Sequence, residues 1–179
     1  RPASGCPLSR RATVVGVGLI GGSIGMALRG QGWHVSGVEA DEDRLTAALD
    51  IGAVDAAGWD VEAEVSFVAT PVGQIPEMVV EALAVAPGGV VTDVGGVKAP
   101  VVEAVGDPRF VGGHPMAGSE QEGVEGADPA MFVDANWVLT PSGDTDDGAF
   151  ALIRSVVTSL GAEVVTLAPD RHDSLVALV

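Results

Sequence analysis

The stretch 12–25, ATVVGVGLIGGSIG, predicts how the fold begins. Residues 12–15 form a short apolar run, which is typical of a buried strand. Gly16, Gly18 and Gly21 follow in the order G-x-G-x-x-G, and apolar side chains then recur at helical spacing. The stretch therefore predicts a strand, a tight glycine turn and a helix.

Each glycine of this turn has its own mechanical reason. Gly16 lets the chain turn sharply, Gly18 lets an anion approach the backbone, and Gly21 lets the helix pack close to the strand. The free N–H groups at the start of the helix, at Leu19 and Ile20, would face the anion together with the positive end of the helix dipole. This arrangement is typical of a dinucleotide pyrophosphate site.

A second predicted strand, 34–38, ends in Glu39, which lies about 20 residues beyond the glycine turn, as a dinucleotide site requires. A carboxylate there accepts hydrogen bonds from the adenosine ribose and repels a 2′-phosphate, so it favours NAD over NADP. The alternative is a glycine-rich turn of another α/β protein beside an ordinary surface Glu. The order of strand, glycines, helix, strand and acid favours the NAD site.

Length and composition limit the class of protein. The 179 residues, 47% of them hydrophobic, predict one domain, or one domain and part of a second. The formal net charge of −16 argues against nucleic acid or an anionic membrane as a partner. The chain shows no apolar run of bilayer length and no signal peptide, and its single Cys6 fits the cytoplasm. Residues 1–11 are predicted to be a disordered lead-in.

Strands and helices alternate along the rest of the chain. Apolar runs predict further strands at 65–70, 90–93, 110–112, 137–140 and 163–167. Helical patterns predict helices at 41–51, 76–85, 100–105, 144–160 and 170–179. The alternation predicts an α/β fold with a doubly wound, mostly parallel sheet and helices on both faces.

Ligands of such sheets bind at the carboxyl ends of the strands, so the loops after the strands are the candidate sites. Thr70, Pro71 and Val72 follow one strand where the chain would pass the nicotinamide ribose of a bound cofactor. An ordinary Thr-Pro at the end of a strand is an equal alternative.

The turn 93–98, DVGGVK, follows the next strand. Asp93 ends that strand beside the cofactor, and Gly96 would let the backbone approach the nicotinamide ring or a substrate. Lys98 could attract a substrate carboxylate or could be a solvated lysine at the start of a helix. By itself, a lysine at such a position favours the solvated alternative.

His114 lies in GGHPMAGSE, directly after a predicted strand. A His at the ligand edge can accept a proton from a substrate hydroxyl, as oxidation by hydride transfer to NAD requires, or it can simply cap the Gly-Gly turn. Ser119 and Glu120 would line the same pocket, orient His114 or cap the next turn. His172 is expected to be a structural or supporting residue, and the sparse Cys and His content predicts no metal site.

Several motifs together resemble the prephenate dehydrogenase family, whose relatives accept arogenate. They are GVGLIGGSIGMAL at 16–28, DVGGVK at 93–98, GGHPMAGSEQEGVEGA at 112–127, NWVLTP at 136–141 and RHDSLVALV at 171–179. The glycine fingerprint is common to many dehydrogenases, whereas GGHPMAGSE is much more specific. The resemblance covers the chain from Thr13 to Val179.

The resemblance implies oxidative decarboxylation, in which prephenate loses a hydride to NAD and carbon dioxide from its ring, giving 4-hydroxyphenylpyruvate. It places the base at the ring hydroxyl on His114, the pyrophosphate loop on Gly16, Gly18 and Gly21, and the ribose acid on Glu39. It also implies a Rossmann-type NAD-binding domain over 12–168. Gly96, Lys98, Ser119 and Glu120 belong to the substrate pocket on this basis.

The chain departs from the family pattern at two points. Gly96 stands where members often have a Ser that binds the substrate hydroxyl, and Gln121 and Glu122 stand where members often carry a positive charge. The family also continues into a helical domain that forms a homodimer and supplies an arginine. Residues 169–179 are expected to begin the link to that domain, so this half should bind NAD, remain monomeric and have weak or no activity alone.

Two further interpretations remain open. A 3-hydroxyacid dehydrogenase has the same fold but would not need GGHP. An NAD-binding sensor or regulatory module would retain the fold without the chemistry.

Overall fold

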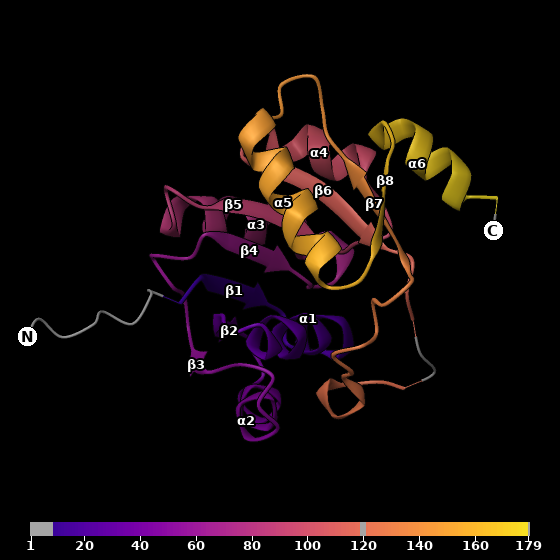
Figure 1. The fold of residues 1–179 in the computed structure, drawn as a ribbon. Coiled ribbons are helices and arrows are strands. Elements are labelled where there is room, and N and C mark those ends of the chain that lie inside the picture. The colour runs from indigo at the N-terminus through magenta and orange to yellow at the C-terminus, as the bar shows by residue number, and fades with distance from the viewer. Residues whose placement is uncertain (1–8, 119–120, 179) are drawn as a thin grey trace, which may run out of the picture.

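The computed structural model describes residues 9–118 and 121–178, which form one eight-stranded sheet covered by helices (Figure 1). The strands are β1 (Arg11–Val15), β2 (His34–Val38), β3 (Ala56–Ala57), β4 (Val65–Val68), β5 (Val90–Asp93), β6 (Phe110–Pro115), β7 (Asn136–Thr140) and β8 (Glu163–Thr166). The helices are α1 (Leu19–Gly30), α2 (Glu42–Asp50), α3 (Ile75–Val85), α4 (Ala99–Val105), α5 (Asp147–Ser159) and α6 (Pro169–Val176). Short 3₁₀ turns lie at η1 (Val72–Gln74) and η2 (Val124–Gly126).

The strands follow the order β3-β2-β1-β4-β5-β6-β7-β8, and every neighbouring pair is parallel except β6 and β7. After β3 the chain returns to the opposite side of β1 to form β4. The carboxyl ends of β1 and β4 therefore flank the point where the strand order reverses, which is where open α/β sheets bind ligands. The expected doubly wound, Rossmann-type fold is confirmed.

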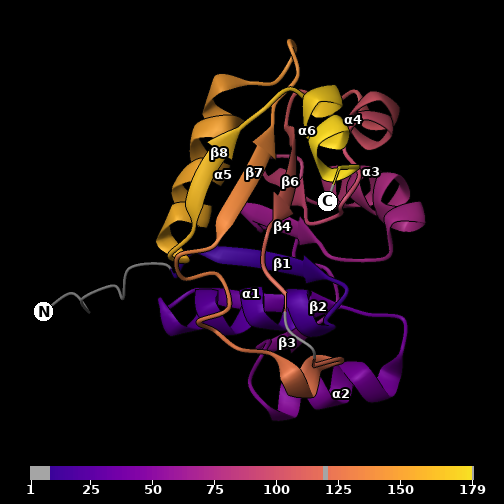
Figure 2. The ribbon, with the colours of Figure 1, turned by 90° about the vertical axis from the view of Figure 1, so that its right-hand side faces the viewer.

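Helices cover both faces of the sheet. Apolar residues of α1 and α5 form one buried cluster with the strands, and residues of α3 and α4 form a second cluster on the other face. Figure 2 shows α5 on one side of the strands and α3 and α4 on the other. Because both faces are covered, all four residues of β4 are buried, which explains why its sequence VSFV does not alternate strictly between apolar and polar residues.

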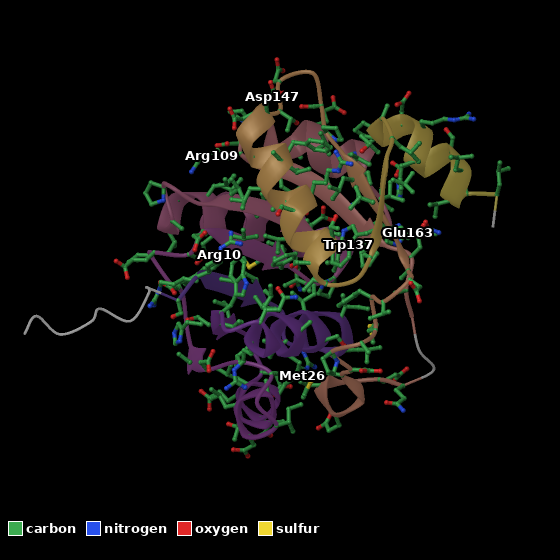
Figure 3. The ribbon with its side chains drawn as sticks, viewed as in Figure 1. Arg10, Met26, Arg109, Trp137, Asp147 and Glu163 are labelled. Carbon is green, nitrogen blue, oxygen red and sulfur yellow. The ribbon has the colours of Figure 1, made fainter. Side chains whose placement is uncertain are left out.

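The first buried cluster contains three aromatic rings packed at angles to one another. The ring of Trp137 of β7, labelled in Figure 3, lies 6.3 Å from the ring of Phe67 and 5.1 Å from the ring of Phe132. Phe132 belongs to the long connection between β6 and β7, so this packing fixes the connection against the sheet.

One pair of strands is not parallel, as a mostly parallel sheet allows. β7 is antiparallel to β6, because the described part of their connection, 116–118 and 121–135, carries no crossover α-helix and packs beside α1 and α2 (Figure 2). Two expectations need correction. The helix expected to begin at 144 begins at Asp147, where the side chain of Asp146 accepts a hydrogen bond from the N–H of Ala149. The disordered lead-in expected at 1–11 does not include Arg11, which belongs to β1. Residues 1–8 lie outside the described residues.

Within the ranges 9–118 and 121–178, no helix has the length and apolar character needed to cross a membrane.

Candidate nucleotide-binding and active site

The glycine loop at 16–18 joins β1 to α1 at the carboxyl edge of the sheet. Gly16 has a φ of +85°, and a Cβ on it would lie 2.7 Å from the carbonyl oxygen of Ala69. A Cβ on Gly21 would overlap the carbonyl oxygen of Gly16. A Cβ on Gly18, in contrast, would meet no described atom within 4 Å. The fold itself therefore requires Gly16 and Gly21, whereas Gly18 leaves open space for a ligand.

The N-terminus of α1 points into this loop. Gly18 is the N-cap and has no side chain that could accept a hydrogen bond from the first turn of the helix. Leu19 and Ile20 then form the start of the helix. Because the first N–H groups of a helix have no partner within the helix, they can bind an anion together with the dipole.

Glu39 lies at the end of β2, across from the glycine loop. Its Oε2 accepts a hydrogen bond of 3.2 Å from the N–H of Val17, and its Oε1 accepts one of 3.1 Å from the N–H of Asp41. The guanidinium of Arg44 lies 3.3 Å from the same carboxylate. These three contacts hold the carboxylate at the rim of the loop.

A pocket of about 510 Å³ lies between the ends of β1, β2 and β4. Thr70 lines it, and the Oγ1 of Thr70 has no hydrogen-bond partner among residues 9–118 and 121–178. The open space at Gly18, the fixed carboxylate of Glu39 and the unpaired hydroxyl of Thr70 fit a dinucleotide. The pocket is lined by Val15, Gly16, Gly18, Val38, Glu39, Ala40, Asp41, Arg44, Ala69, Thr70, Pro71, Gln74 and Met78. Val72, also expected at the cofactor, is half exposed in η1 beside this pocket.

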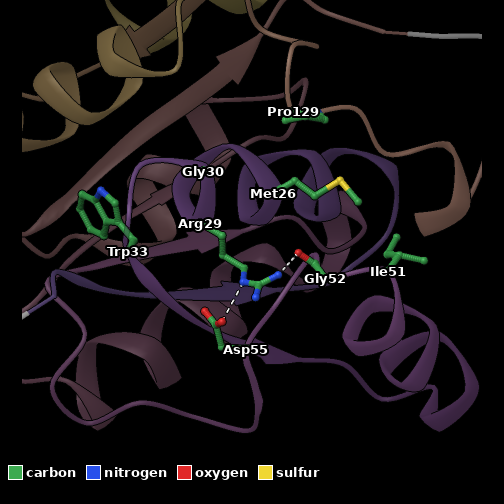
Figure 4. A pocket seen from close by; sticks show the side chains of 8 residues that line it. All are labelled: Met26, Arg29, Gly30, Trp33, Ile51, Gly52, Asp55 and Pro129. Carbon is green, nitrogen blue, oxygen red and sulfur yellow. Dashed lines mark hydrogen bonds and ion pairs between the residues drawn. The ribbon is translucent and has the colours of Figure 1, made fainter.

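A second hollow of about 460 Å³ lies beside the C-terminal part of α1 (Figure 4). The guanidinium of Arg29 crosses it and binds the carboxylate of Asp55 at 2.8 Å and the carbonyl oxygen of Gly52. Because these polar groups bind one another, we interpret this hollow as a part of the surface that stabilises the fold and not as a ligand site.

The turn after β5 differs from expectation at Lys98, which is fully buried and not solvated. Its ammonium binds the carboxylate of Asp93 and donates a hydrogen bond of 2.8 Å to the carbonyl oxygen of Gly113. The carboxylate of Asp93 also accepts from the N–H groups of Gly95 at 2.9 Å and Gly113 at 3.0 Å. Burial raises the pKa of the Asp93 carboxyl and lowers the pKa of the Lys98 ammonium, and their contact opposes both shifts.

The glycine pair before His114 allows this close packing. A Cβ on Gly112 would overlap the Oγ1 of Thr140 and lie in ordinary contact, 3.5 Å, with the Cδ of Lys98, and a Cβ on Gly113 would lie 2.6 Å from the carbonyl oxygen of Asp93. The pair lets β6 approach the turn 93–98, so the ammonium of Lys98 lies within the protein. The sequence-based interpretation missed this because burial of a side chain depends on strands that are distant along the chain.

His114 lies near the end of β6 and contacts His172 of α6. The Nδ1 of His114 is 3.0 Å from the Nε2 of His172, and the two rings are 5.2 Å apart at 77°. A Cβ on Gly96 would lie 3.6 Å from both Cε1 and Nε2 of His114. The Nε2 edge of His114 therefore faces the glycine turn after β5. His172, expected to be a structural or supporting residue, contacts the candidate base directly.

The environment of His114 keeps the imidazole neutral. Partial burial, together with the nearby His172 and the positive charge of Lys98, lowers the pKa of His114 to about 4. Asp173 acts in the opposite direction and more weakly. At neutral pH, His114 is therefore able to accept a proton.

Two expected pocket residues, Ser119 and Glu120, lie outside the described residues. The structure brings the other candidates together at one edge of the sheet, in the loops after β1, β2, β4, β5 and β6. Within the described ranges, no group of three or more His, Cys, Asp or Glu side chains is arranged to hold a metal ion.

The fold and this edge define a dinucleotide-binding domain of the dehydrogenase class. A family model described as "Prephenate dehydrogenase, nucleotide-binding domain" matches residues 24–166. The chain belongs to this family.

Relatives and solved structures agree with the family. The prephenate dehydrogenase of Bacillus subtilis is 33% identical over 93% of this chain and 48% of its own length. A structure of Synechocystis arogenate dehydrogenase is 35% identical, with a TM-score of 0.84 over 93% of this chain and 63% of that one. Aquifex aeolicus prephenate dehydrogenase, solved with hydroxyphenyl propionate and NAD+, is 28% identical, with a TM-score of 0.87 over 95% and 64%.

The chain thus spans about half the length of the curated relatives it matches. The prediction of NAD as cofactor is confirmed by the nucleotide-binding family model and by the neighbour that contains NAD+.

Proposed function

We propose that the complete protein catalyses the NAD-dependent oxidative decarboxylation of prephenate to 4-hydroxyphenylpyruvate. The observation that carries this proposal is His114, a neutral imidazole whose Nε2 faces Gly96 at the same sheet edge as the glycine loop. Removal of a hydride from the carbon that bears the ring hydroxyl requires a partner for the hydroxyl proton. His114 has the position and the protonation state for this role.

The cofactor would be held by the groups already described. The glycine loop and the helix start at Leu19 and Ile20 would bind the pyrophosphate, and Glu39 would bind the adenosine ribose. The loop at 70–72 would lie along the nicotinamide ribose. When bound, NAD supplies the hydride acceptor. The carboxylate of Asp93 is occupied by contacts within the protein, so we propose that it shapes the cofactor-side loop through the backbone.

The substrate would lie beside Gly96, and we propose that Ser119 and Glu120 belong to the same pocket. The buried ammonium of Lys98 would act on the site through the electric field, because its charge helps to keep His114 neutral. The net charge of −16 disfavours a dianionic substrate at long range. We therefore expect the rest of the protein to contribute a positively charged group to the substrate site. We also propose that the complete protein is a homodimer and acts in the cytoplasm.

Arogenate is the second candidate substrate, because the arogenate dehydrogenase of Synechocystis is 35% identical to this chain. The two substrates differ in a side-chain keto or amino group. A non-catalytic NAD-binding module is the third possibility, supported by the Gly in place of the family's Ser at position 96.

The test is the appearance of NADH absorbance when the complete protein is mixed with NAD and prephenate. Parallel reactions contain arogenate or NADP. Turnover with prephenate, and its loss in His114→Asn, would support the proposal. NADH binding without turnover of either substrate would support the non-catalytic module, and undiminished turnover in His114→Asn would exclude His114 as the base.

A further inference from the structure

Three side chains form a continuous chain from the active-site edge to helix α6. The Nδ1 of His114 is 3.0 Å from the Nε2 of His172, and the Nδ1 of His172 is 2.8 Å from the Oδ1 of Asp173. His172 is almost completely buried, with an exposed fraction of 1%. Both contacts have the length of a hydrogen bond, so each must contain one hydrogen.

The positions of these hydrogens follow from Asp173. Its carboxylate accepts hydrogen bonds from the N–H of Lys98 at 2.8 Å and the N–H of Ala99 at 2.9 Å. These donors and the contact with His172 lower the pKa of the Asp173 carboxyl, so the group is ionised at neutral pH and can only accept. The hydrogen between His172 and Asp173 must therefore lie on the Nδ1 of His172.

One hydrogen assignment then determines the next. A neutral imidazole has a single N–H, so a His172 that donates from Nδ1 can only accept at Nε2. The hydrogen between the two imidazoles must then lie on the Nδ1 of His114. This leaves the Nε2 of His114, on the side of Gly96, unprotonated and able to act as an acceptor.

We infer that His172 and Asp173 are positioning residues, which hold His114 in the Nδ1–H tautomer with Nε2 ready to accept a proton. This inference rests on the proposed function for its catalytic meaning. The physical reason is that the hydrogen bond made by one ring nitrogen determines which nitrogen is protonated.

The proton balance of the step is simple. The O–H bond of the substrate hydroxyl breaks and its proton forms a new N–H bond at the Nε2 of His114, while the O–H electron pair forms the C=O bond and the ring carbon gives up its hydride; bound NAD would supply the hydride acceptor. His114 becomes an imidazolium that still donates from Nδ1 to His172. The negative charge of Asp173 favours that cation and partly offsets the burial and the charges of His172 and Lys98, which lower the pKa of His114. When the ring loses carbon dioxide, the electron pair of the broken C–C bond returns through the ring to the oxygen, which takes the proton back from His114.

The tautomer can be measured directly on this chain without any substrate. The three histidines of the ¹⁵N-labelled chain are examined at about pH 8, where free imidazoles are neutral, by long-range ¹H–¹⁵N correlation spectra. We expect His114 to be protonated at Nδ1 and unprotonated at Nε2. A spectrum in which His114 carries its proton on Nε2 would overturn the inference, whether or not the protein proves to be a dehydrogenase.

Three variants test the role of the partners. His172→Phe fills the same space without an acceptor, so His114 should lose its preference for Nδ1–H. His172→Gln offers an oxygen at the reach of Nε2 and should restore the preference. Asp173→Asn removes the charge and should produce a mixture of tautomers. His34→Gln, far from the site, assigns its resonances and should leave His114 unchanged.

Kinetics of the complete protein provide the second measurement. His172→Phe should lower kcat by about 100-fold, the lower range for loss of a general base, with a smaller change in KM and recovery in His172→Gln. An unchanged tautomer in a folded His172→Phe would overturn the positioning role. A shifted tautomer in a protein without turnover would uphold the inference and reject the proposed function.

Discussion

At the scale of single residues, the glycine loop separates what folding requires from what a ligand requires. Gly16 combines a positive φ with a backbone atom 2.7 Å from its missing Cβ, whereas Gly18 borders open space. Both glycines belong to one sequence motif, but Gly16 is required by the backbone conformation, whereas Gly18 leaves space for a ligand.

This difference leads to a paired prediction. Gly16→Ala should lower the free energy of unfolding by about 1–3 kcal/mol because it strains the backbone. Gly18→Ala should leave stability nearly unchanged and weaken NADH binding by about tenfold or more, equivalent to about 1.4 kcal/mol. Urea denaturation and NADH fluorescence titration measure the two effects. Equal NADH affinity in Gly18→Ala and the wild type would place the pyrophosphate elsewhere.

A second residue-scale prediction concerns Gly96. Its φ is not in the left-handed region, and a Cβ there would lie at an ordinary 3.6 Å from the ring of His114. Gly96→Ser should therefore change stability by about 0.5 kcal/mol or less. In the complete protein it should raise kcat, because the hydroxyl adds a hydrogen bond at the reacting oxygen. Gly113→Ser is the control, since its Cβ would lie 2.6 Å from the Asp93 carbonyl oxygen and should destabilise the fold.

The depressed pKa of His114 predicts a pH dependence of stability. In the folded chain the pKa is about 4, below the ordinary value of 6.5, so the unfolded chain binds more protons between these values. The free energy of unfolding should therefore have its full value above about pH 6.5 and should decrease as the pH is lowered toward 4. His114→Asn should show a shallower fall in urea titrations at matched pH, and a slope equal to wild type would contradict the neutral imidazole.

At the scale of elements, the buried pair of Lys98 and Asp93 joins β5, α4 and β6. Charges with no exposed surface are stable only when each is paired and hydrogen-bonded, and here the carboxylate has three donors. The pair therefore fixes the turn 93–98 beside His114.

Removal of one partner should be costly. Lys98→Met should lower the free energy of unfolding by about 3–5 kcal/mol, because Asp93 would remain buried without its counter-ion. Arg10→Met is the matched surface control: Arg10 pairs with Glu64 at 3.0 Å where both side chains are about 40% exposed, and it should cost about 1 kcal/mol. Equal losses for the two variants in urea denaturation would mean that the buried pair is not the constraint we describe.

The element that carries both His172 and Asp173 is α6. Asp173 also accepts hydrogen bonds from the first N–H groups around α4, so the contact between α4 and α6 determines the position of the imidazole pair. A displacement of α6 would therefore change the hydrogen bond to His114 directly.

At the scale of the whole molecule, charge dominates long-range behaviour. The net charge of −16 repels the anionic cofactor until it reaches the N-terminus of α1. Raising the ionic strength from about 0.01 to 0.15 M shortens the screening length from about 30 to 8 Å, so NADH association should become faster. Stopped-flow fluorescence measures the rate, with uncharged sucrose as a viscosity control. A rate that falls with salt would show that local positive groups outweigh the net charge.

The sequence by itself determined the features that depend on neighbouring residues. The glycines at 16, 18 and 21 and the alternation of apolar runs with helical patterns are local, because turns, strands and helices depend on residues a few positions apart. These features predicted the fold class and NAD as the cofactor correctly.

Only the tertiary structure decided the features that depend on distant contacts. Lys98 is buried because β6 approaches the turn 93–98, β7 runs antiparallel because its connection packs beside α1, and His114 meets His172 because α6 docks on α4. His114 and His172 are 58 positions apart, and no local pattern encodes a contact over that separation. The protonation state and tautomer of His114 follow from those distant neighbours, since burial and charge act through space.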